Sequence, residues 1–150
     1  MPRIELHTKI KASIETCFDL SRDIDFHKNS LSHTNEKAIA GRMSGLIELG
    51  ETVTWRARHF GLQLSLTSEI TAYDRPNHFR DSMKSGPFAR FDHDHFFKFE
   101  DNQTIMTDIF DYESPLYFLG QIADALFLEK YMTGLLQTRN EQLKAAAELM

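Results

Sequence analysis

The sequence predicts one α+β domain, in which an antiparallel sheet of about seven strands curves around a long C-terminal helix and encloses a cavity. Strand-like alternation from residue 91 to residue 99 gathers phenylalanines and two histidines on one face, a mixture that suits the wall of a partly wet cavity. Glycines punctuate alternating segments between residues 32 and 113. Residues 121–148 hold one glycine, no proline and mostly good helix formers. All 150 residues fit a single domain.

The first elements are a strand and two short helices. Residues 3–10 alternate apolar and polar side chains, which predicts a half-buried strand. Ser13 and Asp23 each precede a helical stretch and suit the N-cap position. Cys17, the only cysteine, lies among apolar neighbours in the first helix. We therefore expect a buried thiol and no intramolecular disulfide, as in a reducing cytoplasm.

Six further strands are expected near residues 32–40, 51–60, 62–73, 78–84, 89–100 and 104–113. A turn at residues 100–103 sets the register of the last hairpin and pairs four inward residues of one strand with four of the next. These pairs are Phe97 with Met106, His95 with Asp108, His93 with Phe110, and Phe91 with Tyr112.

A second hairpin turns at Phe60 and Gly61, which places His59 opposite Leu62 and Trp55 opposite Leu66. Val53, Trp55, Ala57 and His59 then face inward, and Arg56 and Arg58 face water. The turn at residues 85–87 sets no register, because Gly86 permits either parity.

The C-terminal helix is apolar over more than one stripe in its first half, so it must lie against or inside the curved sheet. We expect most of the apolar stripe of this helix to pack in the core, although Phe127 or Met132 could line the cavity. The stripe comprises Phe127, Leu128, Tyr131, Met132, Leu135 and Leu136.

Composition argues against several classes of protein. The net charge is -5 and no cluster of Lys and Arg exists, which disfavours nucleic-acid binding. No apolar run approaches the length of a spanning helix and no signal peptide is evident, so we expect a cytoplasmic protein without membrane insertion. Monomer and homodimer both remain open.

The inward positions form the predicted ligand site, and we expect a small hydrophobic molecule as the partner. His93 and His95 have three open roles: a buried structural pair with Asp108, an acid–base group whose tautomer Asp108 fixes, or two metal ligands with Asp108 or His59 as the third. No supporting ligand motif occurs, so neither a metal nor a cofactor is predicted. The predicted ligand-binding residues are Trp55, His59, Phe91, His93, His95, Phe97, Met106, Phe110, Tyr112, Phe127 and Met132.

The layout resembles the helix-grip fold of the START and Bet v 1-like (SRPBCC) superfamily over nearly the whole chain. The sequence is more specifically similar to bacterial domains of the polyketide cyclase/dehydrase type, through residues 50–55, Arg75-Pro76, residues 85–88, residues 93–96 and residues 108–115. The resemblance implies a cavity that accepts a lipid, polyketide or aromatic compound. It implies no shared catalytic residue.

The leading hypothesis is a non-enzymatic binding protein for a small hydrophobic or amphipathic molecule, because no nucleophile motif or phosphate loop accompanies the aromatic face. The alternative is a cyclase, dehydratase or hydrolase with His93 or His95 as acid–base and Asp108 as the orienting group. A third hypothesis is a protein-interaction module that exposes a contiguous apolar patch.

Overall fold

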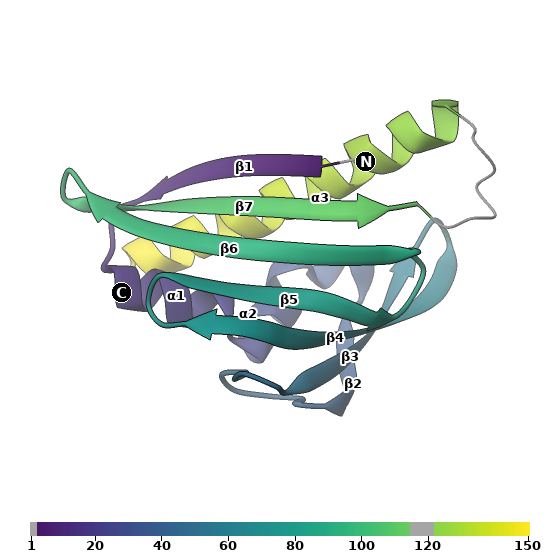
Figure 1. Cartoon of the computed structure of the whole chain (residues 1–150), viewed down its shortest axis with the longest axis horizontal. Coiled ribbons are helices and arrows are strands. Elements are labelled where there is room, and N and C mark those ends of the chain that lie inside the picture. The colour runs from purple at the N-terminus through teal and green to yellow at the C-terminus, as the bar shows by residue number, and fades with distance from the viewer. Residues whose placement is uncertain (1–2, 115–121) are drawn as a thin grey trace.

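A computed structural model describes residues 3–114 and 122–150, with side chains of the last helix described from residue 126. One sheet of seven antiparallel strands, in the order β1-β7-β6-β5-β4-β3-β2, curves over three helices (Figure 1). The predicted α+β class and the element order are both confirmed. The strands are β1 (Arg3–Ile10), β2 (Lys37–Gly41), β3 (Thr52–His59), β4 (Leu62–Asp74), β5 (His78–Ser85), β6 (Arg90–Glu100) and β7 (Gln103–Glu113).

The helices are α1 (Ile14–Ser21), α2 (Ile24–Ser30) and α3 (Ile122–Glu148). Both predicted N-caps are confirmed: Ser13 Oγ accepts from the backbone of Thr16 at 3.1 Å, and Asp23 Oδ1 accepts from the backbone of Asp25 at 2.9 Å. These caps satisfy amide groups that have no partner within the first helical turn. The predicted first residue of α3, Gln121, lies outside the described residues.

The strand predicted at residues 32–40 is shorter than expected. Ser32–Thr34 forms a 3₁₀ turn, and β2 begins only at Lys37. Thr34 Oγ1 donates to the carbonyl of Leu31 at 2.8 Å, and Asn35 adopts a left-handed conformation with φ 54°. Such local side-chain bonds compete with strand pairing, which explains why the strand starts late.

Both predicted hairpin registers are confirmed pair by pair. Each turn has two central residues with positive φ: Phe60 and Gly61 between β3 and β4, and Asp101 and Asn102 between β6 and β7. Turns of this kind match the twist of the flanking strands. Arg56 and Arg58 are exposed, as the alternation predicted.

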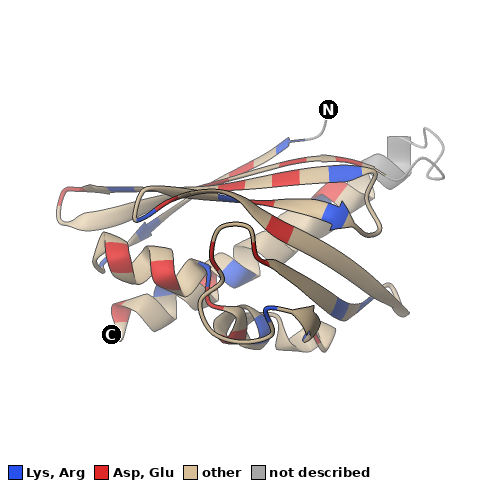
Figure 2. Ribbon diagram, turned by 60° about the horizontal axis from the view of Figure 1, so that its bottom comes forward, with Lys and Arg blue, Asp and Glu red and all other residues tan. Residues whose placement is uncertain are grey.

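The helices gather on one side of the sheet, and β2, β3 and β4 bend toward them (Figure 2). The buried core includes Cys17, Phe18 and Ile10 from the N-terminal elements and Leu143 from α3, all with no exposed surface. Lys, Arg, Asp and Glu are interspersed on the outer strand faces, where for example Arg90 pairs with Asp111 at 2.8 Å. Across the described ranges, no helix has the length and apolar character needed to cross a membrane.

Candidate functional site

An internal cavity of about 330 Å³ lies between the inner face of the sheet and helices α2 and α3. Its walls are mostly aromatic and aliphatic. Alternate residues of β3, β4, β5 and β6 supply one side, because period-two alternation points them all toward the helices. Helix α3 supplies the other side through one stripe of Leu128, Tyr131, Met132, Leu135, Leu136 and Arg139.

One end of the cavity opens beside the turn between β3 and β4. Phe60 and Leu62 line the cavity yet are 50% and 61% exposed, so they mark its mouth. The Phe60 ring centroid lies 4.5 Å from that of Tyr131 and 5.4 Å from that of Phe127. Three aromatic rings therefore border the opening.

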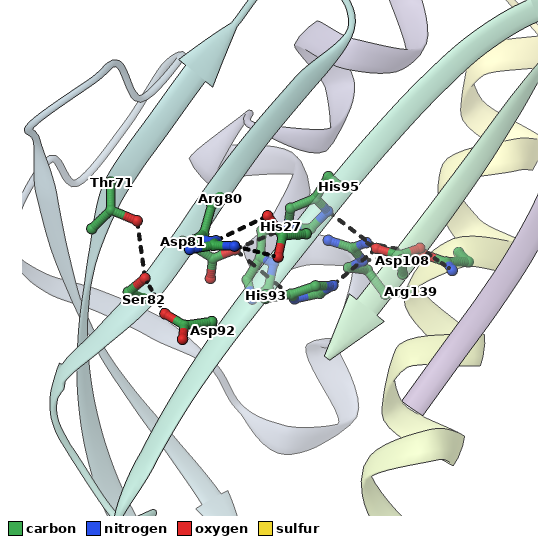
Figure 3. Close-up of polar contacts among 12 residues, drawn as sticks. His27, Thr71, Arg80, Asp81, Ser82, Asp92, His93, His95, Asp108 and Arg139 are labelled. Carbon is green, nitrogen blue, oxygen red and sulfur yellow. Dashed lines mark hydrogen bonds and ion pairs between the residues drawn. The ribbon is translucent and has the colours of Figure 1, made fainter. Parts of the chain in front are cut away.

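A buried polar network built around Asp108 (Figure 3) supplies Asp81, His93, His95 and Arg139 to the lining of the cavity. Asp108 has no exposed surface. Its Oδ1 accepts from His93 Nε2 and from Arg139 Nη2, both at 2.9 Å, and its Oδ2 accepts from Asn140 Nδ2 at 2.8 Å. Burial alone would raise the pKa of Asp108, but Arg139, His93 and His95 hold it well below its usual value. The carboxylate is therefore ionised.

His95 lies between two carboxylates. Its Nε2 donates to Asp81 Oδ1 at 2.9 Å, and its Nδ1 lies 3.1 Å from Asp108 Oδ1, off the direction that a hydrogen bond requires. A bare lone pair on either nitrogen would face a negative oxygen, so both nitrogens carry protons. Burial alone would lower the pKa of His95, but its contacts with Asp108 and Asp81 raise it.

His93 is the neutral partner of this pair. Its ring stacks on that of His95 with the centroids 3.9 Å apart, so a second positive charge there would meet direct repulsion. Burial first, and then the charge of His95, lower the pKa of His93. Because Nε2 donates to Asp108, the remaining nitrogen, Nδ1, holds a lone pair.

The charges of this network balance. Asp81 is ionised as well: burial would raise its pKa, but the hydrogen bond from His95 lowers it. Two carboxylates, Asp81 and Asp108, thus face one guanidinium, Arg139, and one imidazolium, His95. Buried charges are tolerated when they are paired and hydrogen-bonded in this way.

A second polar group lies along the wall. Glu36 accepts from His27 Nε2 at 3.0 Å, and the ring centroid of His27 lies 4.5 Å from that of Trp55. His59 Nδ1 lies 2.6 Å from the Tyr131 hydroxyl. Burial lowers the pKa of His59, which favours its neutral form.

Most of the predicted site residues line one cavity. These are Trp55, His59, Phe91, His93, His95, Phe110 and Met132. The predicted contact between His95 and Asp108 exists, but Asp108 lies behind the histidines and does not reach the cavity.

Four residues predicted to bind ligand do not line the cavity. Phe97 packs against Phe18 of α1, with ring centroids 5.3 Å apart, and Met106 contacts Ser21 of the same helix. Helix α1 therefore fills the end of the inner face that these two residues occupy. Tyr112 packs against Phe88 and Phe110 in a second core cluster, and Phe127 stands at the mouth with 58% of its surface exposed.

Sequence reasoning missed Asp81 and Arg139, which complete the polar end of the cavity. Asp81 lies opposite His93 in the pairing of β5 and β6, a register that the turn at Gly86 left open. Arg139 belongs to a polar segment of α3, and only its unmatched charge on a helix expected to be buried could have indicated it. Neither residue belongs to a motif.

Asp81, His93 and His95 are also the described residues that could hold a metal ion, because one ligand atom from each lies within 4.8 Å of the others. A metal binds in the plane of an imidazole ring, whereas these two rings stack at an interplanar angle of 29°. One ring would have to turn, breaking its bond to Asp81 or Asp108. The arrangement observed is a hydrogen-bonded network rather than a preformed metal centre.

Comparison with solved structures decides the fold. The protein TTHA0849 from Thermus thermophilus superposes with a TM-score of 0.74 at 21% identity, over 97% of this chain and 99% of that one. A START superfamily protein from Mycobacterium smegmatis gives 0.74 at 12% identity, over 98% and 97%. Ginseng major latex-like protein 151 from Panax ginseng gives 0.69 at 16%, over 97% of each chain. The chain has the START/Bet v 1-like fold.

The START/Bet v 1-like resemblance predicted from the sequence is thus confirmed for the fold. No family model and no curated protein matches the sequence. Superpositions at 12% to 21% identity establish the fold of the chain, but not what occupies the cavity. The function must therefore be argued from the cavity and the residues that line it.

Proposed function

We propose that this protein binds one small hydrophobic or amphipathic molecule, of the lipid, polyketide or aromatic class, in the cavity between the sheet and α3. The observation that carries the proposal is an internal space of about 330 Å³ with largely apolar walls. This volume falls within the range of small-molecule sites, which are typically apolar with a few polar groups that fix orientation. Here those groups gather around His93 at one end and Glu36 along the wall.

The protein carries its own reporter of occupancy. Trp55 is the only tryptophan in the chain and lines the cavity. We expect the neutral dye 1-aminoanthracene to gain fluorescence in the cavity and to quench Trp55, and apolar competitors to displace it. A protein that neither brightens the dye nor shows quenching with any apolar compound would contradict the proposal.

A matched pair of variants on β3 tests where the dye binds. Ala57 lines the cavity with 6% of its surface exposed, whereas Arg56 faces water. Ala57→Phe should fill part of the cavity and weaken dye binding by at least about tenfold, or ~1.4 kcal/mol. Arg56→Phe adds the same ring on the outer face and should leave binding unchanged. Equal affinities in two folded variants would place the dye elsewhere.

One observation favours an enzymatic alternative. His93 Nε2 donates to Asp108 at 2.9 Å, an arrangement that fixes the tautomer of a general base. In that alternative Nδ1 takes a proton from a bound substrate during cyclisation, dehydration or hydrolysis. Replacing His93 with Gln should then lower turnover by roughly 10²–10⁴ while ligand affinity changes little. Unchanged turnover in the folded variant would rule out His93 as the general base.

A further inference from the structure

The polar end of the cavity, formed by Asp81, His93, His95 and Arg139, has a definite pattern of free hydrogen-bonding positions. The Nε2 proton of His95 points at Asp81, and the Nε2 proton of His93 points at Asp108. The Nδ1 of His95 is buried 3.1 Å from Asp108 Oδ1, off the direction of a hydrogen bond. Neither histidine therefore offers an accessible proton to a guest. What they leave toward the cavity is the lone pair of His93 Nδ1, which accepts no hydrogen bond from the described residues.

Asp81 adds a second acceptor. Its Oδ1 accepts from His95, while its Oδ2 accepts nothing from the described part of the chain, and the side chain lines the cavity with 22% of its surface exposed. The two acceptor residues are neighbours, because Asp81 Oδ1 lies 3.9 Å from His93 Nδ1. A group that donates one hydrogen bond can therefore reach either of them.

Arg139 supplies a limited donor at the same end. Its Nε and Nη2 are directed at Asn140 and Asp108, which leaves Nη1 as the nitrogen without a described partner. A hydroxyl group both donates and accepts one hydrogen bond. It can satisfy Asp81 or His93 and accept from Arg139 at once.

Charge excludes a carboxylate as the polar end of the guest. The network is already neutral, so a carboxylate guest would bury an uncompensated negative charge beside Asp81. Buried unpaired charges are costly, and like charges in contact are costlier still. A guest without any polar group would displace water and leave the acceptors of Asp81 and His93 without a hydrogen-bond donor.

We propose that the polar end of the cavity selects an uncharged hydroxyl, of an alcohol or phenol, on an otherwise apolar guest, which donates its one hydrogen bond to Asp81 or His93. This inference rests on the proposed binding function and specifies its ligand class. It names Asp81 as the residue that rejects carboxylates.

Three ring-matched compounds test the selection in the unmodified protein: 2-naphthol, 2-naphthoate and naphthalene, measured at pH 7 by calorimetry or by Trp55 quenching. We expect 2-naphthol to bind at least about tenfold more tightly than either of the others, a difference of ~1.4 kcal/mol. Naphthoate or naphthalene binding as tightly as naphthol would overturn the selection. No binding of the three, while 1-aminoanthracene still binds, would overturn it too and leave the cavity function standing. Failure of the dye as well would overturn both.

A pair of variants assigns the selection to Asp81. Asp81→Asn removes the negative charge and offers a donor, so it should narrow the preference for naphthol over naphthoate by about tenfold. Asp92→Asn is the control, because Asp92 lies on β6, accepts from Ser82 Oγ at 2.6 Å and does not line the cavity. The control should keep the full preference. Unchanged selectivity in folded Asp81→Asn would overturn the role of Asp81. If that variant does not fold, the three naphthalene compounds measured on the wild type still test whether the cavity selects a hydroxyl.

Discussion

At the scale of single residues, Asp108 is the acceptor on which the polar network depends. Its two oxygens contact His93, His95, Arg139 and Asn140, contributed by β6 and α3. A buried carboxylate is tolerated because each of these partners offers a proton or a positive charge. Asp108 therefore ties the long helix to the sheet and orients both histidines.

Replacing Asp108 with Ala should lower the free energy of unfolding by about 3–5 kcal/mol, because Arg139 would keep a buried charge without a carboxylate partner and His95 would lose one of its two carboxylates. Asp111→Ala on the same strand is the control. Asp111 faces outward with 42% of its side chain exposed and pairs with Arg90, so its loss should cost about 1 kcal/mol or less. Urea denaturation of both variants measures the difference, and similar losses would contradict the role of Asp108.

The two histidines should make opposite contributions to the pH dependence of stability. The raised pKa of His95 adds stability below the unfolded value of about 6.5, which is lost as the pH rises through its folded pKa. The lowered pKa of His93 adds stability above that value, which is lost as the pH falls through its folded pKa. Together they should favour folding most near pH 6.5.

Ring titrations followed by NMR test this assignment directly. The imidazole of His95 should remain protonated above pH 6.5, and that of His93 should remain neutral below it. In urea unfolding, His95→Gln should lose the decline in stability above pH 6.5 while retaining the decline below it. Two histidines titrating together near 6.5 would contradict the network described here.

At the scale of the elements, turn chemistry decides how far register can be predicted. The turns at Phe60-Gly61 and at Asp101-Asn102 have two central residues each, so the pairing of β3 with β4 and of β6 with β7 followed from counting. The connection between β5 and β6 is longer and passes through Gly86, which fits either parity. The position of Asp81 opposite His93 was therefore not predictable.

Helix α3 should owe its stability to its buried stripe rather than to helix propensity. Leu143 is fully buried, and Leu126 on the same helix is 61% exposed. Leu143→Ala should lower the free energy of unfolding by about 2–5 kcal/mol through the lost contacts and the cavity left behind. Leu126→Ala makes the same chemical change and should shift it by about 0.5 kcal/mol or less. Chemical denaturation that gave equal losses would show that α3 does not dock through Leu143.

At the scale of the whole molecule, the cavity lies at the junction between α3 and the sheet, so occupancy should couple to global stability. A guest that binds only the folded state should add about 2.7 kcal/mol at a concentration 100 times its Kd. Thermal denaturation with increasing 2-naphthol should show a rising Tm for the wild type. Ala57→Phe should show a much smaller rise, and an equal rise in both would place the guest outside the cavity.

The sequence by itself determined the order of the strands and helices and the registers of the two tight hairpins, because alternation and turn geometry act over a few neighbouring residues. The start of β2 was the exception. The sequence also placed Trp55, His93 and His95 on the inner face. The sequence did not predict which inward residues line the cavity, because alternation shows which face of the sheet a residue occupies and not which helix covers that face.

The tertiary structure decided how the inner face is divided. Helix α1 covers Phe97 and Met106 and turns them into core, whereas the part near His93 remains open to the cavity. Docking of α3 brings Arg139 onto Asp108, which lies 31 residues earlier in the chain. These contacts depend on the packing of whole elements against one another, and packing at such separations leaves no local pattern in the sequence.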